Sequence, residues 1–271
     1  MTGDTTPPAG TGSAGGAAPP DAYVLSIVIP ALNEHDRLPP TLRRINEFLM
    51  SDTQWRPAEI IVVDDGSTDA TGDAARAVEL GNDIELVVLT HVNNRGKGAA
   101  TRTGFAGSRG SWVLLTDADL ASPIEEVAVL AEHTSGRRTI AVGSRAVDRR
   151  LITDPQPWYR DLMGRTFNLA VRVLGLSRIS DTLSAFKLLP GEIARALAAA
   201  QRLDGFAFDV EHLALCGLWD VEALEVGVRW RHVEASRVLA ARHSAQMLRD
   251  IIRLWWWRRR GLLPRDPGAV R

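Results

Sequence analysis

The sequence predicts an α/β fold in which a mostly parallel β-sheet is covered by helices on both faces. From Tyr23 onward, short apolar runs rich in Val, Ile and Leu alternate with amphipathic stretches. Apolar runs without a polar face are typical of strands that are buried on both sides, as in parallel sheets. The composition, with 45% hydrophobic and 24% charged residues in a chain of 271, is that of an ordinary globular protein.

The expected elements alternate in a regular order. The pattern predicts strands at residues 24–29, 59–63, 84–89 and 112–115, and helices at 38–50, from 67 or 68 to about 80, and at 98–106. Ser67 or Thr68 is expected to cap the second of these helices. Ligands of such sheets bind beyond the carboxyl ends of the strands, so the residues that follow each strand are the candidates for a functional site.

Composition divides the chain into three segments. Residues 1–22 are rich in Gly, Ala, Pro and Thr and bury too little surface to fold, so we expect a disordered tail. Residues 23–236 carry the regular pattern and form the predicted folded domain, which has an excess of acidic residues. Residues 237–271 carry nine arginines against two aspartates. A basic segment attached to an acidic body indicates contact with an anionic partner.

The cysteine content and the hydropathy pattern indicate a compartment. Cys216 is the single cysteine, which excludes a disulfide within the chain and favours a reducing environment. No apolar run is long enough to cross a bilayer, and the N-terminus lacks the basic start and apolar stretch of a secretory signal. We therefore expect a cytoplasmic location.

Two common phosphate-binding motifs are excluded. No G-x-G-x-x-G sequence follows the first strand, so a dinucleotide-binding fold is not expected. Gly96-Lys97-Gly98 resembles part of a P-loop, but His91 stands where its first glycine should be and Ala99 replaces its Ser or Thr. The sequence therefore argues against an NTPase.

A pair of carboxylates follows the strand at 112–115. Asp117 and Asp119 flank the small residue Ala118. Carboxylates at this spacing suit Mg²⁺ or Mn²⁺, which usually takes one or two of them together with substrate phosphates. The alternative is that one of the two aspartates caps a helix that begins near Pro123, which leaves the other unexplained. We expect a site for a metal ion or a diphosphate.

A second acidic pair, Asp64 and Asp65, ends the strand at 59–63. One interpretation is structural, because Asp-Gly-Ser is a common turn that Asp65 can stabilise. The other is that a carboxylate here accepts a hydrogen bond from a nucleobase. Together with the first strand end at 30–34, these acidic strand ends are expected to converge on one edge of the sheet.

Four motifs in order resemble an inverting, GT-A-type glycosyltransferase of family 2. They are S-I-V-I-P-A-L-N-E at 26–34, V-V-D-D-G-S-T-D at 62–69, N-R-G-K-G at 94–98 and T-D-A-D-L at 116–120. The later segments resemble the polyprenyl-phosphate (dolichyl-phosphate) sugar synthases, and most of all their β-glucosyltransferase branch. These are V-G-S-R at 142–145, W-Y-R at 158–160, D-T at 181–182, F-K-L at 186–188 and F-D-V-E at 208–211. The resemblance covers nearly all of residues 23–255.

On the donor side, the resemblance implies a nucleotide-sugar site. It assigns Pro30, Asn33, Glu34 and Asp64 to the nucleoside pocket, with Lys97 beside it.

The resemblance also assigns the reacting groups. Asp117 and Asp119 would bind the metal, Mg²⁺ or Mn²⁺, and the donor diphosphate. Arg145 and Arg160 would receive the phosphate of a lipid acceptor, since the planar guanidinium matches phosphate oxygens. Asp209 would act as a base or orient one of these arginines.

The implied activity is transfer of a hexose, with glucose from UDP-glucose the first expectation, onto a polyprenyl or dolichyl phosphate at the cytoplasmic face of the membrane. One alternative is mannose transfer from GDP-mannose, and another is a membrane-associated module without catalytic activity. Nucleic-acid binding is not expected, because the body is acidic and basic–aromatic interleaving is confined to the C-terminal segment.

Three further residues or segments leave alternatives open. Arg165 is equally compatible with phosphate binding and with a surface ion pair. Trp230-Arg231-His232 has two interpretations: the segment approaches the acceptor, or His232 is structural, which is the more common role of a lone histidine after a strand. Leu183-Ser184-Ala185 departs from the Gln-Cys-Gly that the glucosyltransferase branch usually carries here, which leaves the acceptor geometry and the donor choice open.

The segment at 243–260 predicts an amphipathic helix that ends in three tryptophans and three arginines. Tryptophan favours the headgroup region of a bilayer and arginine favours anionic lipid, so we expect this helix to lie on the membrane surface. The alternative is a helix packed on the folded domain. The membrane is preferred because three adjacent tryptophans cannot all face one core.

Overall fold

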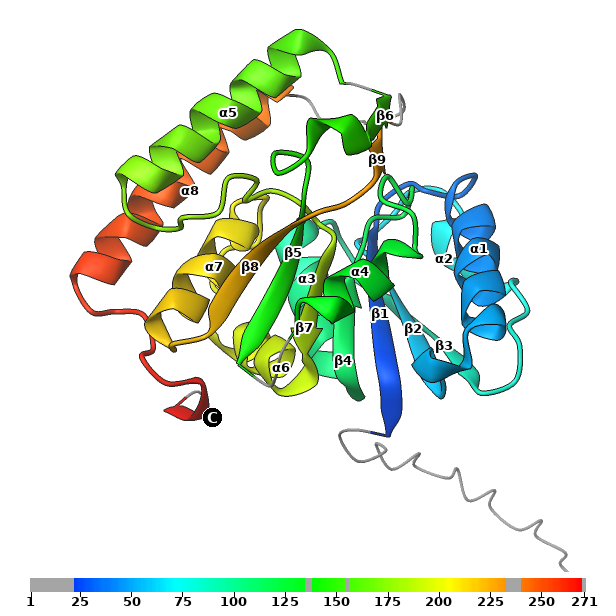
Figure 1. Ribbon diagram of the computed structural model, residues 1–271. Coiled ribbons are helices and arrows are strands. Elements are labelled where there is room, and N and C mark those ends of the chain that lie inside the picture. Colours follow the sequence, from blue (N-terminus) through cyan, green and yellow to red (C-terminus); the bar gives the residue numbers. More distant parts are fainter. Residues whose placement is uncertain (1–21, 135–137, 155, 233–239, 270–271) are drawn as a thin grey trace, which may run out of the picture.

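A seven-stranded sheet with helices on both faces forms the centre of the computed structural model, which describes residues 22–134, 138–154, 156–232 and 240–269 (Figure 1). The strand order is β3-β2-β1-β4-β7-β5-β8. The strands are β1 (Tyr23–Ala31), β2 (Ala58–Asp64), β3 (Ile84–Thr90), β4 (Gly110–Leu115), β5 (Thr139–Ser144), β7 (Lys187–Pro190) and β8 (Glu222–Gly227).

The sheet is mostly parallel, as predicted. β1 pairs with β2 and β4 in parallel, and β2 pairs with β3 in the same way. β7 is antiparallel to both β4 and β5, so β5 runs in the direction of β4. β5 and β8 are again parallel. The carboxyl ends of six strands consequently lie at one edge of the sheet.

Two apolar layers hold the helices on the sheet. On one face, residues such as Val28 and Val63 pack with α3 (Lys97–Gly107), α6 (Gly191–Ala200) and α7 (Phe208–Leu218). On the other face, residues such as Ile27 and Ile29 pack with α1 (Leu38–Ser51), α2 (Thr71–Arg76) and α4 (Glu126–Glu132). Successive residues of β1 therefore enter opposite layers, which explains the unbroken apolar run.

The predicted elements agree with the structure except at α2. This helix spans only Thr71–Arg76, and Ala70 precedes it without a side-chain cap, so the predicted cap at Ser67 or Thr68 is wrong. Ser67 and Thr68 both bind Asn33 instead of capping the helix. The Asn33 amide donates to Ser67 Oγ at 2.9 Å, and its Oδ1 accepts the Thr68 amide at 2.8 Å. A tertiary contact between two loops has replaced a local cap.

The two longest helices lie together at one side of the molecule (Figure 1). They are α5 (Trp158–Val173) and α8 (Ala240–Arg259). The Arg258 guanidinium donates to the carbonyl of Gly175, which joins the last turn of α8 to the loop after α5. Near them, a small parallel ribbon pairs β6 (Ile152–Asp154) with β9 (Trp230–Arg231).

The C-terminal helix α8 packs on the domain and also presents apolar residues to solvent. Ile251, Leu254 and Trp257 are buried in the same core as α6 and α7, whereas Ile252 and Trp256 are exposed. The packed alternative thus holds for one face of the helix. Of the predicted tail at 1–22, all but Ala22 lies outside the described residues.

Candidate active site

Charged residues from four strands meet at the carboxyl edge of the sheet. Glu34 follows β1, Asp65 follows β2, Asp117 and Asp119 follow β4, and Arg145 follows β5. The parallel pairing of β1 with β2 and β4 brings these strand ends side by side. The predicted convergence of acidic strand ends is therefore observed.

A cavity of about 310 Å³, here called the acidic cavity, opens between these strand ends. Of the residues assigned to nucleotide-sugar binding, Pro30, Glu34, Lys97 and Asp117 line it. Its other lining residues are Ala31, Leu32, Arg37, Asp65, Asn94, Gly96, Ala100, Ala118, Asp119 and Phe206.

Asn33 and Asp64 stand apart from the described lining of the acidic cavity. Asn33 adopts a left-handed conformation with φ 56° and joins the loop after β1 to the loop after β2. The buried Asp64 carboxylate accepts the Ser67 amide at 2.9 Å. Both residues shape the loops that border the cavity, and their contact with a nucleoside stays a prediction.

The loop before α3 shows why its glycines are needed. Gly96 has φ 105°, and an added Cβ would lie 2.4 Å from the carbonyl oxygen of Asp204. At Gly98 an added Cβ would lie 2.6 Å from the carbonyl oxygen of Leu203. The Asp65 carboxylate accepts the amides of Arg95 and Gly96 at 3.0 and 2.7 Å. The loop is therefore fixed at the cavity by close contact with the backbone at 203–204 on one side and by the Asp65 carboxylate on the other.

Lys97 is held against the metal-binding candidates. Its Nζ donates to Asp117 Oδ1 at 2.5 Å. Burial alone would lower the pKa of Lys97, but the nearby charges of Asp117 and Asp209 outweigh it and raise the pKa above its usual value. The ammonium therefore stays protonated and places a positive charge beside Asp117, in a wall that holds four carboxylates and the Arg37 guanidinium.

The carboxylates of Asp117 and Asp119 fit a divalent cation. Burial, and then the charge of Asp117, raise the pKa of Asp119. A cation beside both would remove this repulsion, and hard oxygen ligands suit Mg²⁺ or Mn²⁺. Across the described ranges no three His, Cys, Asp or Glu side chains form a complete metal site. Neither aspartate caps α4, whose N-terminus has no side-chain cap.

A second cavity, of about 190 Å³ and here called the bridging cavity, lies on the other side of these carboxylates. Asp117 and Asp119 line both cavities. Arg145 and the segment 183–185, where the chain departs from the family pattern, line the bridging cavity as well. The departure therefore lies beside the metal-binding candidates. Trp230 and His232 also line this cavity, so the segment 230–232 borders the site, as the alternative to a purely structural role for His232 requires.

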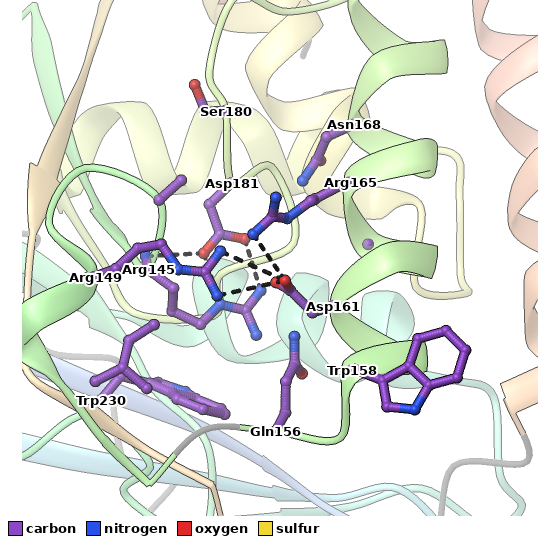
Figure 2. Close-up of a pocket in the computed structure, with 13 residues that line it drawn as sticks. Arg145, Arg149, Gln156, Trp158, Asp161, Arg165, Asn168, Ser180, Asp181 and Trp230 are labelled. Carbon is purple, nitrogen blue, oxygen red and sulfur yellow. Dashed lines mark hydrogen bonds and ion pairs between the residues drawn. The ribbon is translucent and has the colours of Figure 1, made fainter.

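A third cavity, of about 260 Å³ and here called the arginine cavity, adjoins the bridging cavity (Figure 2). Arg145, Gln156 and Trp230 line both. Arg149 and Arg165 reach the arginine cavity from opposite sides and share the carboxylate of Asp161, at 3.4 and 2.8 Å. Three guanidinium groups thus face two carboxylates, those of Asp161 and Asp181, in one cavity.

Arg145 is the most firmly held of these cations. Its Nε and Nη2 donate to the two oxygens of Asp181 at 2.7 and 2.6 Å, and its guanidinium lies over the Trp230 ring. Burial alone would lower its pKa, but Asp181 raises it. The Glu225 carboxylate in turn accepts the amides of Ser180 and Asp181 at 2.9 and 2.8 Å. A buried network therefore fixes the guanidinium plane.

The other two residues assigned to catalysis are placed differently. Arg160 lies in α5, and its side chain is outside what the structure describes. Asp209 is buried in α7, and its carboxylate is bonded to the ammonium of the buried Lys187. Asp209 lines none of the three cavities. Its charge acts on Lys97 through space, so a direct base role stays a prediction.

Some lining residues were not selected from the sequence. Arg149 lines the arginine cavity, and Asp65 and Phe206 line the acidic cavity. The sequence analysis places Asp65 in a turn, and its position after β2 is the available signal for a site. Arg149 and Phe206 lie in short or irregular segments, where no periodicity points to a cavity.

Comparison with known proteins agrees with this geometry. Residues 26–186 match the family described as Glycosyl transferase family 2. The human dolichyl-phosphate beta-glucosyltransferase is 33% identical over 239 residues, which cover 84% of this chain and 74% of the relative. The Drosophila melanogaster protein of the same name is 34% identical over 241 residues, covering 85% and 74%. The Saccharomyces cerevisiae protein of that name is 31% identical, covering 84% and 73%.

Solved structures share the fold. Mannosyl-3-phosphoglycerate synthase from Rubrobacter xylanophilus superposes with a TM-score of 0.60 at 18% identity, covering 89% of this chain and 76% of that one. Glucosyl-3-phosphoglycerate synthase from Mycobacterium tuberculosis, in complex with Mn²⁺ and UDP-glucose, gives 0.56 at 20% identity, covering 86% and 79%. The expected GT-A-type architecture is confirmed. The chain is a glycosyltransferase that belongs to glycosyl transferase family 2.

Proposed function

We propose that this enzyme transfers glucose from UDP-glucose to the phosphate of a polyprenyl or dolichyl lipid, with Mg²⁺ or Mn²⁺ as cofactor. The names of the relatives at 31–34% identity support the sugar and the acceptor. One observation carries the proposal. The bridging cavity shares Asp117 and Asp119 with the acidic cavity and Arg145 with the arginine cavity, so the proposed donor and acceptor sites have walls in common with one central space.

The acidic cavity is the proposed donor site. A nucleoside diphosphate repels the carboxylates of this wall unless a cation lies between them. Asp117 and Asp119 would hold the ion, with the remaining ligands supplied by diphosphate oxygens and water. When bound, the metal stabilises the charge that develops on the departing nucleoside diphosphate. Lys97, protonated and bonded to Asp117, adds a second positive charge at the same wall.

The arginine cavity is the proposed acceptor site. Arg145, Arg149 and Arg165 outnumber the carboxylates of Asp161 and Asp181 by one, and this net positive charge attracts the anionic phosphate of a monoester. Arg149 and Arg165 are more than half exposed and contact Asp161 from both sides, so they can exchange that carboxylate for a ligand. The Nε and Nη2 groups of Arg145 are bonded to Asp181, so only the rest of its guanidinium can bind the acceptor phosphate.

Positioning accounts for the chemistry better than a general base does. A phosphate monoester has a second pKa near ~6 and is already largely a dianion at neutral pH. The acceptor is therefore nucleophilic without proton removal. The arginines need only direct it toward the sugar in the bridging cavity. The burial of Asp209 and its bond to Lys187 are consistent with a reaction in which Asp209 takes no proton from the acceptor.

A location at the cytoplasmic face of the membrane follows from the two substrates, since the lipid lies in the bilayer and the nucleotide sugar in the cytosol. None of the helices in the described ranges is both long and apolar enough to span a bilayer. The proposed contact is peripheral, through the exposed face of α8, where Leu248, Ile252 and Trp256 lie near the arginines at 258–260.

A transfer assay tests the proposal. The purified chain is incubated with labelled UDP-glucose, a water-soluble short-chain prenyl phosphate and Mn²⁺ or Mg²⁺, and the labelled prenyl phosphate is measured. We expect product that disappears with chelator and in Asp119→Ala. Product from GDP-mannose alone would keep the acceptor and replace the donor. Absence of product from both donors would contradict the proposed acceptor.

A further inference from the structure

The outward face of α5 is apolar where a surface helix is usually polar. Asp161, Gly164, Asn168 and Val171 face the domain. The large apolar residues of the opposite face are exposed, and they are Trp158, Tyr159, Leu162, Met163, Leu169 and Val173. Trp158 and Val173, at the two ends of the helix, are each 78% exposed. The apolar face therefore runs the whole length of the helix, about 24 Å for 16 residues.

The exposed apolar residues of the molecule are concentrated here. Among the described residues, fourteen large hydrophobic side chains are exposed, of which six lie on α5 and three on α8. Scattered apolar residues on a surface need no explanation, but a contiguous patch marks a surface that binds something. The two helices lie at one side of the molecule, and the bond from Arg258 to the carbonyl of Gly175 joins α8 to the loop after α5 (Figure 1).

The charges around this face match an anionic surface. Arg165 and Arg172 on α5 and Arg253 and Arg259 on α8 are exposed. The acidic residues of the two helices are Asp161, which is ion-paired with Arg149 and Arg165, and Asp250, which is buried. Apolar and aromatic side chains with arginines at their border are typical of helices that lie in the headgroup region of a bilayer.

The face begins at the arginine cavity. Trp158, the first residue of α5, lines the cavity and is also the start of the apolar face (Figure 2). A lipid whose phosphate enters the arginine cavity would leave its apolar chain at this end of α5. The bilayer is therefore the occupant that accounts for both the apolar face and its position.

We propose that the outward face of α5 rests on an anionic bilayer and is a principal membrane contact of this enzyme, alongside α8. The inference deepens the proposed function, since it explains how a lipid phosphate reaches the arginine cavity. The membrane contact then consists of two helices, α5 and α8, and not of α8 alone.

Vesicle binding tests the inference with a matched pair of variants. Leu162→Glu/Leu169→Glu places two charges on one side of α5, at residues that are 56% and 54% exposed and line no described cavity. Met50→Glu, at 44% exposure on α1, is the control. Binding of the purified full chain is measured by flotation with vesicles of phosphatidylcholine containing phosphatidylglycerol. We expect the α5 variant to bind at least about tenfold more weakly and Met50→Glu to bind as the parent does.

Transfer to a water-soluble prenyl phosphate separates this inference from the proposed function. The α5 variant should keep that activity and lose transfer to a long-chain acceptor in vesicles. Vesicle binding that is unchanged in the α5 variant, or absent in the parent, would overturn the inference. So would self-association of the parent in solution that the α5 variant abolishes, since the face would then bind a second copy. If the parent chain transfers no glucose to the water-soluble prenyl phosphate, that result would instead count against the proposed function.

Discussion

The acidic cavity and the arginine cavity are built in different ways. Most of the acidic cavity is formed by residues at or after the carboxyl ends of β1, β2 and β4, whose parallel pairing fixes their spacing, and the start of α3 completes it. The arginine cavity is formed by α5, the loop after β5 and the short strand β9. Its cations are held by the carboxylates of Asp181 and Asp161, which line the same cavity. The sheet sets the first site, whereas a side-chain network sets the second.

The difference suits the two ligands assigned to these cavities. A donor diphosphate with a metal requires fixed oxygens, which strand ends provide. An acceptor that arrives from a bilayer requires a surface that can exchange its ion pairs, and Arg149 and Arg165 are exposed enough to do so. Substitutions in the acidic cavity should therefore affect kcat, whereas those in the arginine cavity should affect the use of the acceptor.

The largest effect is expected at Asp119. Asp119→Asn keeps the shape of the side chain but removes its charge from the wall shared by the acidic and bridging cavities. We expect kcat for transfer to fall about a thousandfold, because the departing diphosphate loses its metal. Steady-state assays at saturating metal measure this. Asp73→Asn, at an exposed carboxylate on α2, is the control. A loss below tenfold would mean that Asp119 does not hold the metal.

Arg145→Lys tests whether a fixed guanidinium plane matters in the arginine cavity. Lysine keeps the charge but cannot make the paired bonds to Asp181. We expect kcat/KM for the prenyl phosphate to fall about a hundredfold, with the affinity for UDP unchanged. Circular dichroism confirms that the variant is folded. An equal fall in the affinity for UDP and in kcat/KM for the prenyl phosphate would contradict the assignment of the two ligands to separate cavities.

Arg165 should matter less, since its guanidinium is exposed and shares Asp161. Arg165→Ala is expected to raise KM for the acceptor by about three- to tenfold and leave kcat unchanged. Arg172→Ala, two turns further along α5 and away from the described cavities, is the matched control. An equal effect of both variants would assign Arg165 to general charge attraction.

The smallest effect on activity is expected at Glu211, which supports the backbone beneath the acidic cavity. Its buried carboxylate accepts the amides of Arg202 and Leu203, and burial raises its pKa from 4.5 to about 7. The folded protein thus binds more protons than the unfolded chain between these values, so the free energy of unfolding falls as pH rises from 4.5 to 7.

Denaturant titration across this pH range checks the sign. Glu211→Gln should remove a pH-dependent loss of at most about 3 kcal/mol, with transfer kinetics unchanged. A parent chain whose free energy of unfolding rises over the same window more steeply than that of the variant would contradict the assignment.

The sequence predicted the sheet and the donor side well. Strands at 59–63 and 84–89 and helices at 38–50 and 98–106 lie within one or two residues of β2, β3, α1 and α3. Periodicity carries this information directly, because burial on two faces requires an unbroken apolar run. Pro30, Glu34, Lys97 and Asp117 line the acidic cavity because each ends a strand, follows a strand or begins a helix at the same edge.

What the sequence did not predict depends on tertiary contacts. Ser67 and Thr68 bind Asn33 instead of capping α2, and nothing local distinguishes the two outcomes. Arg149 enters the arginine cavity from a short segment without a regular period. The helix α8 buries Trp257 and exposes Trp256, a split that depends on where the domain surface lies.

Separate binding measurements on the two ligands test the central claim most directly. Calorimetry is performed with UDP and Mn²⁺, and separately with a short-chain prenyl phosphate, on the parent chain and on Asp119→Asn and Arg145→Lys. The account predicts that Asp119→Asn weakens only UDP with Mn²⁺ and that Arg145→Lys weakens only the prenyl phosphate. Loss of both ligands in either folded variant would contradict the division of the active site into a donor cavity and an acceptor cavity.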